Sequence, residues 1–154
     1  MKTLIPVDGS VYTTRLLDFV CKHRPLLGEP PEITLVTVVP GVPSHAANYL
    51  GHDVLAGYYQ EQADAVLQPA LATLRAAGIE ATPVFRKGHA AEVIGKMADA
   101  EGFELLLMGS HGHSALRGLV LGSVVAGVLT RLWQTDVWSH NVGDSVSGFF
   151  ATTV

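Results

Sequence analysis

Cysteine is almost absent from this chain: Cys21 is the single one among 154 residues. No internal disulfide can form, so nothing in the sequence requires an oxidising compartment. Basic residues are also few, 10 Lys and Arg against 14 Asp and Glu, which gives a formal net charge of −4. This balance excludes a protein that binds nucleic acid by neutralising phosphates over a broad basic surface. Charged residues make up only 16% and hydrophobic residues 48%, which predicts a compact globular domain.

Long hydrophobic runs are lacking as well. The apolar run that follows Lys2 stops at Asp8, short of the roughly 7–15 residues of a signal-peptide core. The longest uncharged stretch, residues 33–52, is broken by Pro40 and Pro43, whereas a membrane-spanning helix needs ~20 apolar residues. We therefore expect no secretion signal, no membrane partner and a cytoplasmic location.

What the chain does have is a regular alternation of apolar runs and helical patterns. The runs are too continuous for strands with one exposed face, so they predict buried parallel strands with helices on both faces of the sheet. Pro69 lies inside one helical pattern and is expected to kink or divide that helix. The strands are expected at residues 3–8, 33–39, 79–86 and 105–108, and the helices at 11–24, between Gly51 and Gly78, at 90–100, and from Ser123 onward.

A glycine-rich segment follows the fourth predicted strand. Gly109 and Gly112 precede a helix that starts at Gly122 and Ser123, with Val124 in its first turn. Glycines let a backbone approach an anion closely, and the free N–H groups of a helix start attract negative charge. The simpler alternative is that the glycines form a turn and Ser123 caps the helix.

Position favours the anion site over the simple turn. In open parallel sheets, ligands bind beyond the carboxyl ends of the strands, where both this segment and the sequence Asp8-Gly9-Ser10 are expected to lie. If the first and fourth strands are neighbours, the two segments share one crevice. Taken on its own, Asp8 is more readily explained as an ordinary cap of the helix that follows it.

Gly109, Gly112, Gly122 and Ser123 follow the spacing glycine, two residues, glycine, nine residues, glycine and serine. This spacing, together with Pro-Val-Asp-Gly-Ser at residues 6–10, resembles the ATP-binding branch of the universal stress protein family. The resemblance extends to about residue 131. It implies a single doubly wound, mostly parallel five-stranded α/β sheet with helices on both faces, and a homodimer.

The resemblance also implies a ligand. Asp8 and the backbone of Val7 and Val38 are expected to hold adenine. The residues of the glycine signature, with Val124 in the same helix start, are expected to surround ribose and phosphates. Arg117 either contacts the terminal phosphate or faces water. The implied cofactor is ATP, with or without Mg²⁺.

Other kinds of site fit the sequence less well. A Walker site would need a lysine before the helix-opening serine, and Leu121-Gly122-Ser123 has none. His111-Gly112-His113 resembles the signature of nucleotidyltransferases, but in those enzymes the motif follows the first strand. Two histidines one residue apart supply only two metal ligands. No serine lies in a Gly-x-Ser-x-Gly elbow, so no catalytic residue is assigned.

The C-terminal segment departs from the family pattern. Residues 134–142 carry Asp, Ser, His and Asn where the family has an apolar strand. We therefore divide the chain into a nucleotide-binding domain, 1–135, and an atypical tail, 136–154. The fifth strand is expected to be short and irregular, around 136–139. Residues 149–154 have strand-forming composition and are expected to fold back over the protein or pair with a second subunit.

These observations predict an ATP-binding stress-response protein that senses or stores nucleotide, acts through partners, and hydrolyses ATP slowly or not at all. Two alternatives remain open. One is a nucleotide phosphotransferase or ATPase that uses His111 or His113. The other is an interaction module with a vestigial pocket.

Overall fold

The computed structural model describes residues 1–47, 49, 51–110, 122–132, 137–141 and 148–153. Helices and strands alternate through most of this range, as predicted. The elements are β1 Lys2–Pro6, α1 Val11–Lys22, a 3-10 helix η1 Arg24–Leu27, β2 Glu32–Val39, α2 Ser44–Ala47, α3 His52–Ala76, β3 Thr82–Lys87, α4 Ala90–Ala100, β4 Leu105–Gly109, α5 Ser123–Arg131, β5 Val137–Asn141 and β6 Gly148–Thr153.

The described strands form one six-stranded sheet in the order β3-β2-β1-β4-β6-β5. The pairs β3–β2, β2–β1 and β1–β4 are parallel. β6 pairs antiparallel with both β4 and β5. The predicted α/β fold with a parallel sheet flanked by helices is therefore confirmed.

The predicted strand count of five is wrong. Four strands are parallel, and the C-terminal residues add an antiparallel pair. The strand expected around 136–139 is β5, yet it lies at the sheet edge and β6 takes the place beside β4. Composition gives the physical reason: Ser139, His140 and Asn141 suit an exposed edge, whereas Phe149 and Phe150 favour the interior of a sheet. The expectation that residues 149–154 fold back over the protein is met by β6, which pairs with β4 over five residues.

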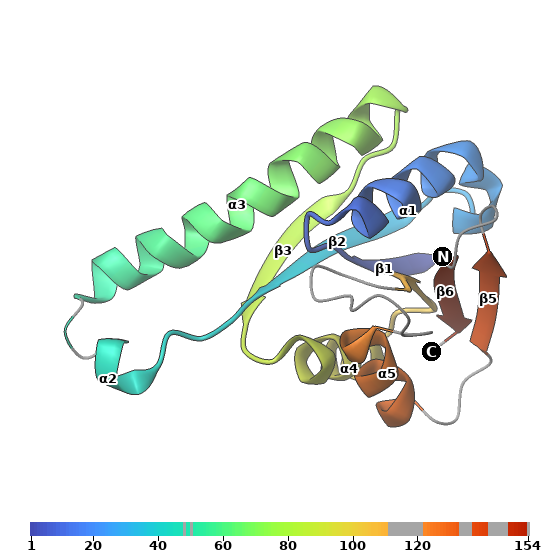
Figure 1. Ribbon diagram of the computed structural model, residues 1–154. Helices are drawn as coiled ribbons and strands as arrows, with labels where there is room; N and C mark the ends of the chain where they lie inside the picture. The colour runs from blue at the N-terminus through green and yellow to red at the C-terminus, as the bar shows by residue number, and fades with distance from the viewer. Residues whose placement is uncertain (48, 50, 111–121, 133–136, 142–147, 154) are drawn as a thin grey trace.

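The helices cover both faces of the sheet, with α1 and α3 on one face and α4 and α5 on the other (Figure 1). Each pair buries its own apolar cluster against the strands. On the α1 and α3 face the cluster includes Leu16, Leu67 and Leu71. On the α4 and α5 face it includes Ile94 and Val128. The central strands are covered on both sides, which explains their continuous apolar runs.

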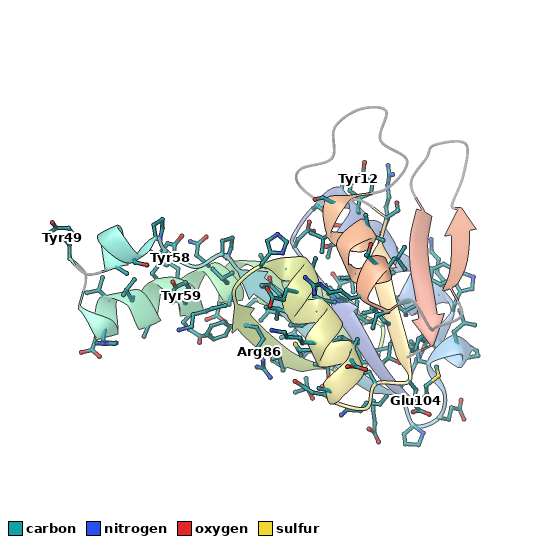
Figure 2. The ribbon with its side chains drawn as sticks, turned by 90° about the horizontal axis from the view of Figure 1, so that it is seen from below. Tyr12, Tyr49, Tyr58, Tyr59, Arg86 and Glu104 are labelled. Carbon is teal, nitrogen blue, oxygen red and sulfur yellow. The ribbon has the colours of Figure 1, made fainter. Side chains whose placement is uncertain are left out.

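Helix α3 is continuous over 25 residues, although Pro69 lies inside it. A proline removes the bond to the carbonyl four residues earlier, and here both Pro69 and Ala65 are exposed, so water can solvate that carbonyl. Pro69 therefore does not divide the helix. The N-terminal half of α3 runs past the sheet beside α2 (Figure 1). Tyr58 lies on this projecting part of α3, and Tyr49 lies in the connection between α2 and α3 (Figure 2).

Cys21 is partly buried and packs against the α1 and α3 cluster. Within the described parts of the chain, every helix is too short or too polar to span a bilayer.

Candidate functional site

The carboxyl ends of β1 and β4 open a crevice at the centre of the sheet. These two strands are neighbours, as the shared-crevice hypothesis requires, and the chain changes direction across the sheet at this point. The described residues pair the two strands only at Thr3 with Leu105 and Leu4 with Leu106. Pro6 then ends β1 without an N–H to donate. The crevice therefore lies where parallel sheets bind ligands.

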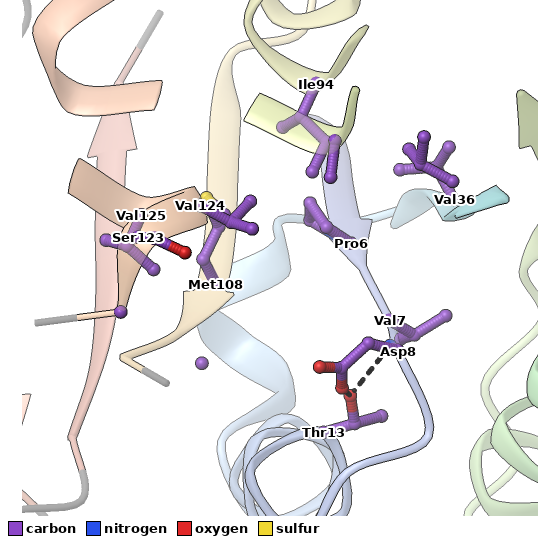
Figure 3. Close-up of a pocket in the computed structure, with 14 residues that line it drawn as sticks. Pro6, Val7, Asp8, Thr13, Val36, Ile94, Met108, Ser123, Val124 and Val125 are labelled. Carbon is purple, nitrogen blue, oxygen red and sulfur yellow. Dashed lines mark hydrogen bonds between the residues drawn. The ribbon is translucent and has the colours of Figure 1, made fainter. Parts of the chain in front are cut away.

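A cavity of about 250 Å³ occupies this crevice. Residues 111–121, which connect β4 to α5, lie outside the described residues. Figure 3 shows the side chains around it. The cavity is lined by Pro6, Val7, Asp8, Thr13, Val36, Val38, Ala90, Ile94, Met108, Gly109, Gly122, Ser123, Val124 and Val125.

The structure brings most of the sequence-predicted site residues to this one cavity. They are Val7, Asp8, Val38, Gly109, Gly122, Ser123 and Val124. Gly112 and Arg117 lie outside the described residues, as do His111 and His113. The residues brought together come from the segment after β1, from β2, from the end of β4 and from the start of α5, which are far apart in the sequence.

Asp8 lies directly after β1, and its carboxylate is held by the turn into α1. Oδ1 accepts a hydrogen bond from the backbone N–H of Ser10 at 3.0 Å and one from the Thr13 hydroxyl at 2.8 Å. Ser10, not Asp8, is the N-cap of α1, because its Oγ accepts from the Thr13 N–H. The cap hypothesis for Asp8 is therefore wrong, and the carboxylate faces the crevice as part of the cavity wall.

The N-terminus of α5 forms the opposite side of the cavity. The N-cap residue is Gly122, which has no side chain to cap the helix, and the first turn contains no acidic residue. The first intrahelical bond runs from the Ala126 N–H to the Gly122 carbonyl at 2.9 Å. The N–H groups of residues 123–125 therefore have no intrahelical acceptor and form a positive helix end. Ser123 is the first helical residue rather than the cap.

Gly122 is positioned by β4. Its N–H donates to the Ser110 carbonyl at 2.8 Å, and Ser110 is buried directly after the strand. This bond brings the start of α5 to the end of β4. Gly109 and Gly122 are thereby held at the same edge of the cavity.

Val7 and Val38 were expected to contact the ligand through their backbones. The Val7 N–H already donates to the Val36 carbonyl at 2.8 Å, so the Val7 carbonyl is the backbone group that would contact a ligand. Val38 lies past the last β1–β2 pair, Pro6 with Val36. Val38 therefore lies beyond the end of the β1 ladder, pairs with Arg86 of β3 and lines the cavity.

Sequence reasoning missed half of the wall of the cavity. The missed residues are Pro6, Thr13, Val36, Ala90, Ile94, Met108 and Val125. Most of them are apolar residues, which the sequence predicts to lie in the core. Their position beside the cavity depends on the order of the strands, which the sequence pattern does not give. Thr13 had a readable signal, because it lies on the first turn after Asp8 and carries a hydroxyl.

Metal binding has little support from the protein side chains. The described residues contain no group of three His, Cys, Asp or Glu side chains close enough to hold a metal ion.

Comparison with known proteins identifies relatives of this chain. The sequence profile of the universal stress protein family matches residues 1–137. Universal stress protein Slr1230 from Synechocystis sp. is 32% identical over 130 residues, which cover 84% of this chain and 39% of that protein. The chain therefore spans well under half the length of this relative.

Solved structures share the fold. The hypothetical protein MJ0577 is 25% identical, with a TM-score of 0.70 over 84% of this chain and 88% of that one. A universal stress protein in complex with cAMP is 21% identical, with a TM-score of 0.60 over 84% and 90%. A universal stress protein family protein from Arabidopsis thaliana with AMP bound is 16% identical, with a TM-score of 0.57 over 85% and 86%.

The profile match covers most of the chain, and it includes both sides of the crevice, from Asp8 after β1 to the start of α5. The resemblance seen in the glycine spacing thus extends to the whole domain, and this chain belongs to the universal stress protein family.

Proposed function

We propose that this protein binds ATP in the cavity between β1, β4 and α5, and that it senses or stores the nucleotide and acts through partner proteins. The adenine base lies against Asp8 and the backbone at Val38, and the phosphates lie at the N-terminus of α5. Gly109, Gly112, Gly122 and Ser123 surround ribose and phosphates, Val124 contributes its N–H, and Arg117 meets the terminal phosphate.

One observation carries this proposal: a carboxylate and an uncapped helix N-terminus face each other across a single cavity. The carboxylate accepts hydrogen bonds, as an exocyclic amine requires, and the helix end attracts anions. A nucleotide has both features, a base with an amine at one end and phosphates at the other. The apolar side chains of Val36, Ile94 and Met108 line the same cavity, as is usual for small-molecule sites.

Two relatives of the same fold support the nucleotide class, since one is in complex with cAMP and another has AMP bound. ATP rather than a monophosphate is proposed for this chain on its own glycine spacing. Magnesium, where present, is bound through the phosphate oxygens and the Ser123 hydroxyl.

Slow or absent hydrolysis is part of the proposal. Hydrolysis requires a group that activates water near the terminal phosphate. Asp8 lies at the opposite end of the cavity from α5 (Figure 3), and its Oδ1 already accepts two hydrogen bonds. Asp8 is therefore assigned to the base and not to the chemistry.

The experiment is to extract the purified protein and identify any nucleotide it retains, and then to follow thermal unfolding with added ATP. We expect ATP in the extract, a raised Tm on adding ATP, and intact ATP after hours of incubation. Rapid conversion to ADP would instead support a phosphotransferase or ATPase. An empty extract with no Tm shift would contradict the proposal and favour a vestigial pocket.

We further propose that the protein is a cytoplasmic homodimer that contacts no nucleic acid or membrane. Residues 1–135 form the nucleotide-binding domain, and the tail, 136–154, provides the outer strands. Among the described residues, β5 has a neighbour, β6, on one side only, so its other edge is available to a second chain. Sedimentation tests the dimer: a monomer at micromolar concentration would contradict it.

A further inference from the structure

We propose that the projecting arm of this protein is the docking surface for a partner protein that presents an amphipathic helix with lysine or arginine beside its apolar face. The arm consists of residues 44–47, 49 and 51–61, which are α2, Tyr49 and the first turns of α3. The inference extends the part of the proposed function in which the protein acts through partner proteins, and it names the chemistry of such a partner.

Exposed apolar side chains gather on the arm. Six large apolar residues are exposed in the described part of the chain, and three of them belong to the arm: Tyr49 at 91%, Val54 at 61% and Tyr58 at 43%. Figure 2 shows both tyrosines on the part of the chain that extends away from the sheet. Val54 and Tyr58 are four residues apart, so they lie on the same face of α3. Apolar side chains that share one exposed face indicate an interaction site.

The charges of the arm give the chemistry of the partner. The sequence contains no Lys or Arg between Arg24 and Arg75, and both charged residues of the arm, Asp53 and Glu61, are acidic and exposed. In the part of the chain that the structure describes, neither forms an ion pair. Glu61 follows Tyr58 by three residues, which places its side chain beside the apolar face. A helix with apolar side chains flanked by lysine or arginine complements both features.

Tyr59 fixes the arm to the rest of the protein. Its hydroxyl accepts a hydrogen bond from the Val42 N–H at 2.9 Å. The Lys87 Nζ lies 5.0 Å from the centre of its ring, within the range of a cation–π interaction. The Tyr58 ring packs edge-on against the Tyr59 ring, with 5.6 Å between the ring centres. Because the surface is held in place before binding, a partner loses little affinity to its ordering.

The acidic character of the arm argues against other occupants. Anionic lipid headgroups and nucleic acids are both held by basic side chains, which the arm lacks. A second copy of the chain that docked arm against arm would bring acidic side chains against acidic side chains, which costs affinity. A basic partner protein is the occupant that gains from this charge.

The arm also begins next to the proposed nucleotide site. Val38 lines the cavity, β2 ends at Val39, and Val42 donates to Tyr59 of the arm. The end of β2 therefore connects the wall of the cavity to the arm over a few residues. A partner bound to the arm would lie at the same edge of the sheet as the nucleotide.

The test uses two fluorescein-labelled peptides of about 18 residues, long enough to form a helix. One contains Leu and Lys at amphipathic helical spacing, and the other has Glu in place of each Lys. Fluorescence anisotropy gives the dissociation constant of each peptide from the full-length protein at about 0.15 M salt, where long-range charge effects are screened.

Two variants of the arm are compared with matched controls. Tyr58→Ser removes an apolar side chain of the arm, and its control is Leu26→Ser, because Leu26 is 54% exposed and lies in η1.

The charge variant combines Asp53→Asn with Glu61→Gln. Its control combines Glu29→Gln with Asp99→Asn, which are exposed residues outside the arm, so that both double variants change the net charge equally.

We expect the Lys peptide to bind wild type, and the Glu peptide to bind at least about tenfold more weakly. Tyr58→Ser is expected to raise the dissociation constant of the Lys peptide at least about fivefold, and the charge variant at least about threefold. Both controls are expected to stay within about twofold of wild type. If Tyr58→Ser does not fold, Val54→Ser removes an apolar side chain from the same face, and its dissociation constant decides.

Several results would overturn the inference. They are the absence of binding of the Lys peptide to wild type, equal binding of the two peptides, and a control variant that loses as much affinity as its arm variant. A dimer that dissociates on Tyr58→Ser, measured by sedimentation, would assign the arm to a second copy of the chain instead.

The failure of this inference is distinguishable from the failure of nucleotide binding. The substituted residues are not among those that line the cavity, so all variants are expected to bind ATP as wild type does. A protein that binds ATP but shows none of the expected peptide differences would overturn only the docking surface. A protein that shows these differences but binds no ATP would contradict the nucleotide site and leave the docking surface in place.

Discussion

Gly95 in α4 and Gly127 in α5 allow these two helices to pack closely against each other. A Cβ added to Gly127 would lie 2.7 Å from the Ala91 Cβ, and one added to Gly95 would lie 3.1 Å from the Arg131 Cδ. Contacts under 3 Å between carbon atoms force one of the groups to move. The absence of these two side chains therefore lets α5 approach α4 closely, and this contact fixes where the start of α5 meets the cavity.

Gly127→Ala is expected to destabilise the protein by about 1–2 kcal/mol. The overpacking against Ala91 costs about 1–3 kcal/mol, and the better helix propensity of alanine returns up to about 1 kcal/mol. Urea unfolding measures the change in the free energy of unfolding. A matched control is Gly57→Ala in α3, where an added Cβ meets nothing within 4 Å; this variant is expected to gain about 0.5–1 kcal/mol. Equal effects of the two substitutions would contradict the close helix contact.

Cys21 is expected to react slowly with alkylating reagents near neutral pH. Burial raises the pKa of its thiol, and the negative charge of Asp18 raises that pKa further, against a smaller opposing effect of Arg24. The thiolate is the reactive form, so at a given pH less of Cys21 is ionised than of a free thiol. Iodoacetamide labelling followed by mass spectrometry should show a lower rate than for glutathione at the same pH, increasing as the pH rises. A rate equal to that of glutathione would contradict the raised pKa.

At the scale of elements, β6 closes the β4 side of the parallel sheet. It pairs with β4 from Leu105 to Gly109 and with β5 from Val137 to Asn141. Deletion of residues 143–154 would remove both ladders and leave β4 with an exposed edge. We expect a lower Tm and concentration-dependent light scattering, because an exposed strand edge pairs with other chains. A truncated protein with the Tm of the full chain would show that β6 does not stabilise the sheet.

The elements differ in how far the sequence predicts them. Both ends of helix α4, residues 90 and 100, are predicted correctly, because the helical spacing of its apolar residues and the residues that flank it indicate the same boundaries. The third strand was expected at 79–86, yet it spans Thr82–Lys87. Ile79 is buried although it lies in the connection from α3 to β3. An apolar residue in a buried connection has the same sequence pattern as the start of a buried strand, so the predicted strand began too early. The order of β5 and β6 depends on long-range pairing with β4, which no local pattern contains.

The residues of the candidate site also differ in how far the sequence predicts them. Gly122 and Ser123 were predicted from helix-start chemistry and Asp8 from the family resemblance, and all three line the cavity. Thr13 and Met108 were not predicted, since their part in the cavity follows from the neighbouring positions of β1 and β4. Local chemistry therefore identified the start of α5, and strand topology was needed for the apolar wall and for Thr13.

At the scale of the whole molecule, the formal net charge is −4, whereas the N-terminus of α5 carries a positive partial charge. Overall charge alone would disfavour binding a polyphosphate. We therefore assign anion binding to the local backbone N–H groups of residues 123–125 and to the lack of acidic residues in the first turn of α5. A negative charge introduced at that point should weaken ATP binding.

The decisive measurement is the dissociation constant of ATP for wild type and for Gly122→Asp, determined by calorimetry with folding checked by thermal unfolding. Gly122→Asp places a carboxylate at the N-cap of α5, where the phosphates are proposed to bind, and aspartate is itself a favourable N-cap residue. The account predicts a folded variant whose ATP affinity is lower by at least about tenfold, or about 1.4 kcal/mol, while His113→Ala keeps nearly the wild-type affinity. A folded Gly122→Asp variant that binds ATP as tightly as wild type would contradict the assignment of the phosphates to α5.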